Sequence, residues 1–133
     1  QSAQPIHASR AGHRMAATWL ARNAQTSGAV LDTRGWTGLY SGRTTYGYEE
    51  AQAAFSHAQL AYVVLEDREL QYPSQRSQTL GRLLDVAAEP VTRFAPPRGR
   101  GYTGHAVVIY RWSAQRFVQW LDSQAALQQA RGT

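Results

Sequence analysis

The sequence contains no cysteine, no lysine and only one methionine. Without cysteine, a disulfide framework and a thiolate site are both excluded. No stretch approaches the roughly 20 consecutive apolar residues that a membrane-spanning helix needs, and no secretory signal peptide is visible. The sequence opens at Gln1 and not at methionine, so we expect either a processed protein or a piece of a longer one.

Because lysine is absent, all 14 basic residues are arginine, and they outnumber the acidic residues to give a net charge of +5 and a pI of about 10.1. A basic surface suits nucleic acid, acidic glycans or anionic lipid headgroups. The arginines are scattered along the chain, and Arg98 and Arg100 form the one local cluster. No nucleic-acid-binding motif accompanies them, so we do not expect a nucleic-acid partner.

The length of 133 residues and the hydrophobic content of 43% allow one folded domain. Apolar periodicity predicts helices over residues 6–23, 48–57, 78–88 and 113–131, and apolar runs predict strands over 29–33, 60–66, 91–94 and 105–112. This alternation predicts a single small, layered, Rossmann-like α/β domain. We expect a mostly parallel sheet of about four strands, with an antiparallel edge hairpin and helices on both faces.

The first and last predicted helices each show an apolar stripe. In the first helix the stripe is Ala8, Ala11, Met15, Trp19 and Leu20, and His13 lies mainly off it. In the last helix, which Ser113 caps, the predicted inward face is Phe117, Val118, Leu121 and Ala125, widened by Trp120 and Leu127. This last helix packs either on the domain or on a partner.

The stretch after the first strand is the first candidate site. The strand ends at Asp32, and three glycines follow at positions 35, 38 and 42. Ligands collect beyond the carboxyl ends of strands in open α/β sheets. Glycines permit close approach of the backbone, and aromatic and arginine side chains offer a contact surface. The predicted binding residues here are Asp32, Arg34, Trp36, Tyr40 and Arg43. The pattern is also compatible with a glycine-rich turn whose aromatic residues join a small core.

The strand over residues 60–66 ends in a second charged group. Glu66 closes the strand, and Asp67 and Arg68 follow it. If this strand neighbours the first one, Glu66 and Asp32 come within reach of each other. Two carboxylates beside arginines suit acid–base catalysis. Surface ion pairs, which contribute under about 1 kcal/mol each, are the favoured alternative. Glu66 and Arg68 complete the predicted binding set.

Other kinds of site lack their motifs. No GxGxxG or GxxxxGK[ST] sequence follows the first strand, so we predict no nucleotide site. The four histidines, His7, His13, His57 and His105, show no metal-ligand spacing and are predicted to occupy surface or cap positions. Ser41 has no GxSxG motif around it. We therefore expect no cofactor, no metal and no catalytic serine.

The order of several landmarks resembles a known family. They are AATWLARNA, GAVLD, YSGR, LAYVVLEDREL, PVTRF and AVVIYRW, which lie between Ala11 and about Trp112. This order is similar to the soluble C-terminal domain of polytopic membrane glycosyltransferases of the protein-mannosyltransferase and aminoarabinose-transferase-like group, which use polyprenyl-phosphate sugars. The segment over residues 113–131 has no matching counterpart.

The resemblance implies an accessory, non-catalytic domain at the periplasmic face of the cytoplasmic membrane, because in that family the catalytic acid and the lipid-phosphate groove belong to the membrane part. No catalytic residue is therefore carried over. The implied partners are the transmembrane portion of the parent protein and a glycan or polyprenyl-phosphate headgroup. Two alternatives stay open: a free-standing α/β enzyme that uses Asp32 and Glu66, and a protein-interaction module that docks through its last helix.

Overall fold

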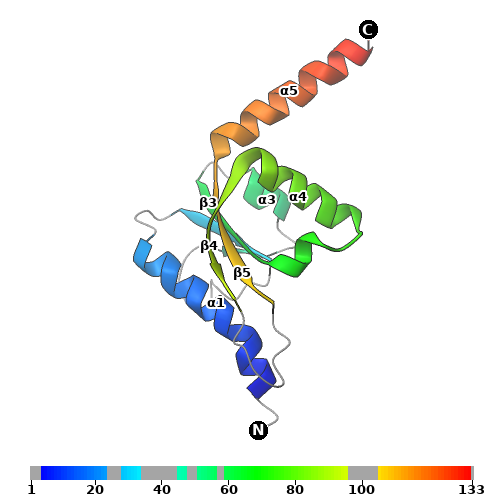
Figure 1. Ribbon diagram of the computed structural model, residues 1–133. Helices are drawn as coiled ribbons and strands as arrows, with labels where there is room; N and C mark the ends of the chain where they lie inside the picture. The colour runs from blue at the N-terminus through cyan, green and yellow to red at the C-terminus, as the bar shows by residue number, and fades with distance from the viewer. Residues whose placement is uncertain are drawn as a thin grey trace.

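A computed structural model of the chain describes residues 4–23, 28–33, 45–47, 51–56, 59–95 and 105–132, with the side chains of residues 4–10, 45 and 52 not described. The elements in order are α1 (Gln4–Asn23), β1 (Ala29–Asp32), β2 (Thr45–Tyr46), α3 (Ala51–Phe55), β3 (Leu60–Glu66), the 3-10 helix η2 (Asp67–Leu70), α4 (Gln75–Ala87), β4 (Ala88–Phe94), β5 (Val107–Trp112) and α5 (Ala114–Gly132). Figure 1 shows these elements around one sheet.

The sheet has the order β2-β1-β3-β5-β4. β1 pairs in parallel with both β2 and β3, whereas β5 runs antiparallel to β3 and to β4. The predicted Rossmann-like α/β domain with an antiparallel edge hairpin is therefore confirmed, but the sheet is mixed, with two parallel and two antiparallel pairings among its described strands, and not mostly parallel. The described sheet has five strands, one more than expected, because β2 is only two residues long and too short to show a period in the sequence.

The centre and the edge of the sheet differ in sequence for physical reasons. β3 is a continuous apolar run, and Val63, Val64 and Leu65 are fully buried because helices cover both of its faces. β4 is an edge strand that contains Pro90, and its register with β5 shifts just after this residue. Proline lacks a backbone N–H and is tolerated at a sheet edge.

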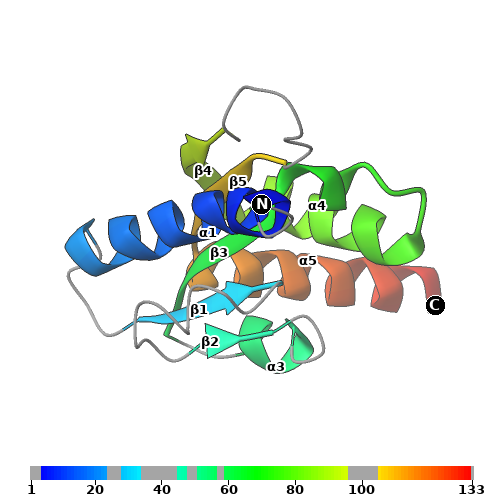
Figure 2. The same cartoon turned by 90° about the horizontal axis from the view of Figure 1, so that it is seen from below.

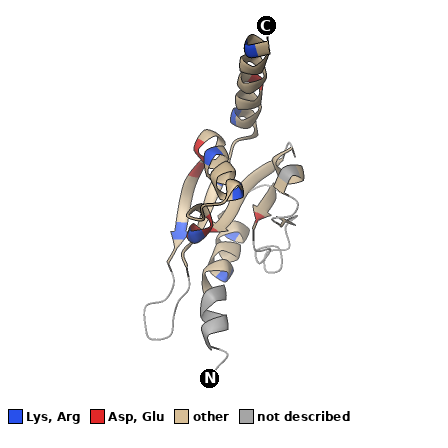
Figure 3. Cartoon of the chain, turned by 90° about the vertical axis from the view of Figure 1, so that its right-hand side faces the viewer, with Lys and Arg blue, Asp and Glu red and all other residues tan. Residues whose placement is uncertain are grey.

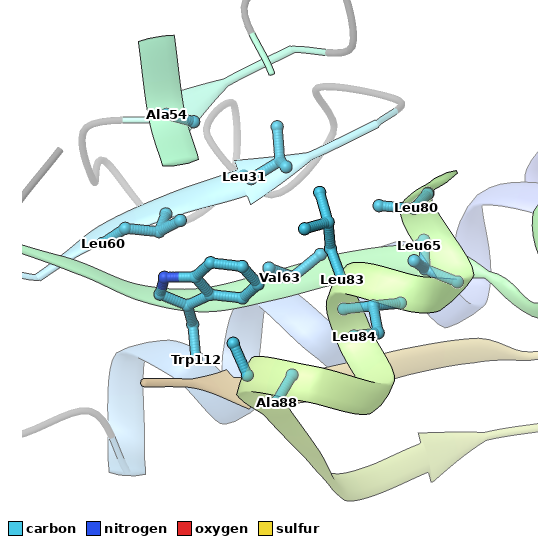
Figure 4. Packing of buried hydrophobic residues seen from close by; sticks show 11 residues of the cluster. Leu31, Ala54, Leu60, Val63, Leu65, Leu80, Leu83, Leu84, Ala88 and Trp112 are labelled. Carbon is cyan, nitrogen blue, oxygen red and sulfur yellow. The ribbon is translucent and has the colours of Figure 1, made fainter. Parts of the chain in front are cut away.

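Helices cover the two faces of the sheet, as predicted. On one face, Ala16 and Leu20 of α1 pack against Val30, Val64 and Ile109. On the other face, α3, α4 and the start of α5 close a second cluster, whose packing around Trp112 is shown in Figure 4. Seen from below in Figure 2, α1 crosses in front of the sheet. Ser74 caps α4 by accepting a hydrogen bond from the backbone N–H of Ser77.

The buried stripe of α1 agrees only in part with the predicted one: Leu20 is buried and Trp19 packs beside it. Met15 was expected to face the core but is 50% exposed, while His13 is fully buried. The stripe in the structure follows Gly12, His13, Ala16, Ala17 and Leu20. These residues are mostly small, so the helix axis comes close to the sheet, and the one polar member finds a partner there.

The expected inward face of α5 is confirmed only in the first turns of the helix. Phe117 and Trp120 pack against the cluster, and the ring of Phe117 lies 5.4 Å from Trp112 and 6.1 Å from Phe55 between ring centroids. Val118 and Leu121 are exposed, no described residue of α5 is buried, and the helix extends away from the sheet (Figure 1). The reason is geometric, because α3 and α4 already cover this face.

Candidate functional site

The two predicted carboxylates lie at the same edge of the sheet and on the same face. β1 and β3 are parallel neighbours, and Asp32 is opposite Val64 in their register. Glu66 lies two residues beyond Val64, and alternate residues of a strand point to one face. Asp32 and Glu66 therefore both face α1, and both are buried.

Glu66 is held by two basic groups. Nε2 of His13 donates a hydrogen bond to Oε2 of Glu66 at 3.0 Å, and the histidine side chain is completely buried. Nε of Arg68 lies 2.8 Å from Oε1 of Glu66, without the direction of a hydrogen bond, and forms an ion pair with it. Both carboxylate oxygens of Glu66 are thus engaged, and the predicted surface ion pair is in fact a buried one.

A glycine brings His13 to this position. Gly12 is buried, and a Cβ atom placed on it would lie 2.8 Å from Cγ2 of Val107 on β5. The missing side chain lets α1 approach β5 closely enough for the neighbouring imidazole to reach the end of β3. The position of the site is therefore set by packing between the helix and the sheet.

Glu69 joins the ends of β1 and β3. Its Oε2 accepts a hydrogen bond from Oγ1 of Thr33 at 2.7 Å and another from the backbone N–H of Glu66 at 2.8 Å. Thr33 directly follows β1, and its own N–H donates to the carbonyl of Val64. Glu69 is buried, so these bonds satisfy a carboxylate that water does not reach.

A second, more exposed charge cluster borders the site. Nη2 of Arg93 donates to Oδ2 of Asp67 at 3.0 Å, and Nδ1 of His105 lies 3.8 Å from Oδ1 of the same residue. These groups come from β4, from the start of η2 and from the segment before β5. Because the arginine side chain is 59% exposed, this pair is a surface contact of small energy.

The geometry favours a structural role for the buried pair. A histidine bonded to a carboxylate is a common acid–base unit, but His13 is 0% exposed and has no access to a substrate. No group of three or more possible metal ligands occurs among the described residues. The pair therefore links α1 to the end of β3 at this edge of the sheet.

Sequence reasoning found part of this site. Asp32 and Glu66 lie at the same edge of the sheet, and Arg68 pairs with Glu66. Arg34, Trp36, Tyr40 and Arg43 lie outside the described residues. It missed His13, which was assigned to the surface, and Glu69, which was not considered. The sequence signal for Glu69 is its place three residues after a strand end, where it can cap the turn.

The described residues also line two shallow grooves away from this edge. One runs along the outer side of α1 beside Phe94, and the other lies between α3 and the start of α5. Neither groove includes Asp32 or Glu66 in its lining. Within the described part of the chain, every helix is too short or too polar to cross a membrane.

Comparison of the chain with models of protein families, with curated proteins and with solved structures gives no match.

Proposed function

We propose that this chain is an accessory, non-catalytic extracytoplasmic domain of a membrane glycosyltransferase that uses a polyprenyl-phosphate sugar. The sequence resemblance given above supports the proposal, and the landmarks of that resemblance lie in one domain. Residues 30–32 belong to β1 and residues 62–66 to the adjacent parallel strand β3, while Leu20 of α1 packs on Val30 and Val64. Segments far apart in the sequence thus form one packed unit.

The observation that carries the non-catalytic part of the proposal is the burial of Glu66 between two basic groups. Its two carboxylate oxygens contact His13 and Arg68, and its side chain is 11% exposed. A general acid or base must reach the proton that it transfers. A free-standing enzyme that uses Asp32 and Glu66 would have to break this buried arrangement, so the accessory role is preferred.

In this proposal the carboxyl edge of the sheet faces the sugar acceptor or the membrane part of the parent protein. Arg68 is the most exposed member of the buried site, with a side chain 36% exposed, and supplies a positive charge at the edge. The predicted aromatic and arginine residues of the segment over residues 34–43 follow directly from β1. Aromatic rings stack on sugar faces, and guanidinium groups bind phosphate.

The binding role is tested by NMR titration of the isotopically labelled chain with a short glycan and with a polyprenyl-phosphate headgroup analogue. We expect shifts of the amide signals of Asp32, Thr33 and Arg68, and of residues 34–43, at millimolar ligand. Arg68→Gln should weaken these shifts, and Arg82→Gln on the exposed side of α4 should not. Unchanged signals at this edge with every ligand would contradict the binding role.

The origin of the domain is tested by the reading frame that encodes it. We expect several long hydrophobic segments upstream of the codon for Gln1. A frame that encodes only these 133 residues would contradict the proposal.

A protein-interaction module is the second candidate, and the exposure of α5 favours it. Val118, Leu121 and Leu127 are 44% to 53% exposed on a helix that contacts the domain only through its first turns. Sedimentation of the chain distinguishes this candidate. Concentration-dependent association that is lost in Leu121→Gln would support it, and a strict monomer at high concentration would argue against self-association through α5.

A further inference from the structure

The outer side of α1 carries a groove that the candidate site does not use. The groove has a volume of about 360 Å³ and lies where α1 passes the end of the edge strand β4. The residues that line it are Arg14, Met15, Thr18, Trp19, Arg22, Asn23 and Phe94. Its floor is therefore aromatic and apolar, and arginines stand at both ends.

The charge of this helix has one sign. The 20 residues of α1 include Arg10, Arg14 and Arg22 and no acidic residue. Figure 3 shows basic and no acidic positions on the described turns of α1. Residues four apart lie on the same side of a helix, so Arg14, Thr18 and Arg22 form one row. Arg22 forms no ion pair within the described part of the chain.

Apolar side chains lie beside this row and are partly open to solvent. Met15 is 50% exposed, and the partly exposed ring of Trp19 is held edge-on against Tyr62 with 5.8 Å between ring centroids. Phe94 adds a second aromatic ring from β4. This side of α1 thus combines positive charge with exposed apolar area, as helices that bind anionic lipid interfaces do.

The neutral polar groups of the groove are turned to the helix itself. Oγ1 of Thr18 donates to the carbonyl of Arg14, and Nδ2 of Asn23 donates to the carbonyl of Trp19. Each of these groups therefore already uses one donor within the helix. What remains is positive charge and apolar area along the helix, which suits an extended anionic and partly apolar surface.

We propose that the outer side of α1 is a docking surface for a bilayer that contains anionic lipid. Arg14 and Arg22 contact the acidic headgroups, while Met15, Trp19 and Phe94 enter the boundary between headgroups and acyl chains. This inference deepens the proposed function and rests on it, because it places the domain against the membrane of its parent protein.

The test is flotation of the full chain with vesicles of phosphatidylcholine alone and with vesicles in which one third of the lipid is phosphatidylglycerol. We expect binding to the anionic vesicles only, with weakening at high salt. Each arginine near an anionic surface is expected to contribute about fivefold in partitioning, so Arg14→Gln/Arg22→Gln should lose both contributions. Met15→Gln should also weaken binding, because it removes the exposed apolar contact.

The matched control is Arg82→Gln/Arg131→Gln, which removes the same charge from α4 and α5. We expect this variant to keep most of the binding, and circular dichroism verifies that all variants remain folded. Equal loss in both double variants would overturn the inference, since overall charge alone would then explain the binding. Failure of the original chain to bind anionic vesicles at low salt would overturn it as well.

A label reports the docked face directly. The chain has no cysteine, so Met15→Cys carries a single environment-sensitive fluorophore, and Gln78→Cys on α4 is its control. We expect a blue shift with anionic vesicles at residue 15 and none at residue 78. No shift at residue 15, with equally tight binding to a soluble polyanion, would assign the face to an acidic macromolecule and overturn the inference.

The two proposals fail separately. If the reading frame encodes membrane-spanning segments but the chain ignores anionic vesicles, the proposed function stands and only the docking surface falls. If no such segments precede the chain, the proposed function falls, and vesicle binding would then describe a peripheral membrane protein.

Discussion

At the scale of single residues, the most distinctive feature of this domain is a group of buried polar side chains. Four of those in the described part of the chain, His13, Asp32, Glu66 and Glu69, lie at one edge of the sheet. Burial removes their hydration, which is unfavourable unless other groups of the protein replace it. The contacts of Glu66 and Glu69 described above supply this replacement, so each of these side chains depends on its neighbours.

The first prediction concerns the buried pair. His13→Leu should lower the free energy of unfolding by about 2–3 kcal/mol, because a bond to a buried carboxylate is lost and Glu66 keeps only Arg68. His13→Leu/Glu66→Leu should be less destabilised than the sum of the two single variants, since neither member of the pair is then left buried without the other. Urea denaturation followed by circular dichroism measures all three. Additive effects would show that the two side chains are not coupled.

The second prediction concerns Tyr110 of β5. Burial, and then the negative charges of Asp85 and Asp67, raise the pKa of Tyr110 above its ordinary value of 10.0. The unfolded chain therefore loses the Tyr110 hydroxyl proton at a lower pH than the folded chain does. The free energy of unfolding then falls as the pH rises above 10. Urea midpoints at neutral pH and above pH 10 should differ less for Tyr110→Phe than for the original chain. Equal differences would contradict this assignment.

At the scale of elements, the close approach of α1 to β5 and the projection of α5 define the domain. The first is possible because small residues line the buried side of α1, and the second follows because α3 and α4 occupy the opposite face. The approach of α1 brings His13 to the end of β3, and the projection of α5 leaves none of the described residues of this helix buried.

The third prediction tests the approach of α1. Gly12→Ala should destabilise the domain by about 1–3 kcal/mol, because the new Cβ would lie 2.8 Å from Cγ2 of Val107. Gly81→Ala in α4 is the control, since nothing lies within 4 Å of its Cβ position. Alanine favours a helix over glycine, so the control should gain about 0.5–1 kcal/mol. Similar gains in both variants would show that α1 can move away without loss.

The fourth prediction concerns α5. Removal of residues 123–133 should change the free energy of unfolding by less than about 1 kcal/mol, because every described residue in this range is exposed. Phe117→Ala should cost clearly more, because its ring contacts Phe55 and Trp112. Urea denaturation compares the two variants. A large loss on truncation would mean that the end of α5 packs on something in solution.

At the scale of the whole molecule, stability is concentrated in the middle of the sheet. β3 lies between β1 and β5, and its residues 63–65 contribute to the clusters on both faces. Both ends of the chain leave this centre, since α1 begins and α5 ends on opposite sides of it (Figure 1). The proposed membrane surface and the candidate site both include residues of α1, and neither includes a residue of α5.

The fifth prediction follows from this distribution. Amide hydrogen exchange should be slowest in β3 and β5 and fastest in the second half of α5. Mass spectrometry of the exchanged chain measures this order. Protection in the second half of α5 equal to that of β3 would show that this helix is covered in solution, as the interaction-module candidate requires.

The sequence alone was sufficient for the features that depend on local pattern. The continuous apolar run at residues 60–66 coincides with β3, and the polar residue after the apolar run of β1 identified its end at Asp32. The fold class followed from the alternation of such patterns, because each reports which sides of a short segment are buried. The meeting of Asp32 and Glu66 at one edge followed from parallel pairing of neighbouring strands.

The tertiary structure alone decided which side of α1 is buried, where α5 points and which partner Glu66 has. His13 and Glu66 are 53 residues apart, and no local period contains information about such a pair. A polar residue is buried in a core only where a complementary polar group lies within bonding distance. A helix is covered only where the other elements leave part of the sheet face unoccupied. Both conditions depend on the packed three-dimensional arrangement and not on the neighbouring sequence.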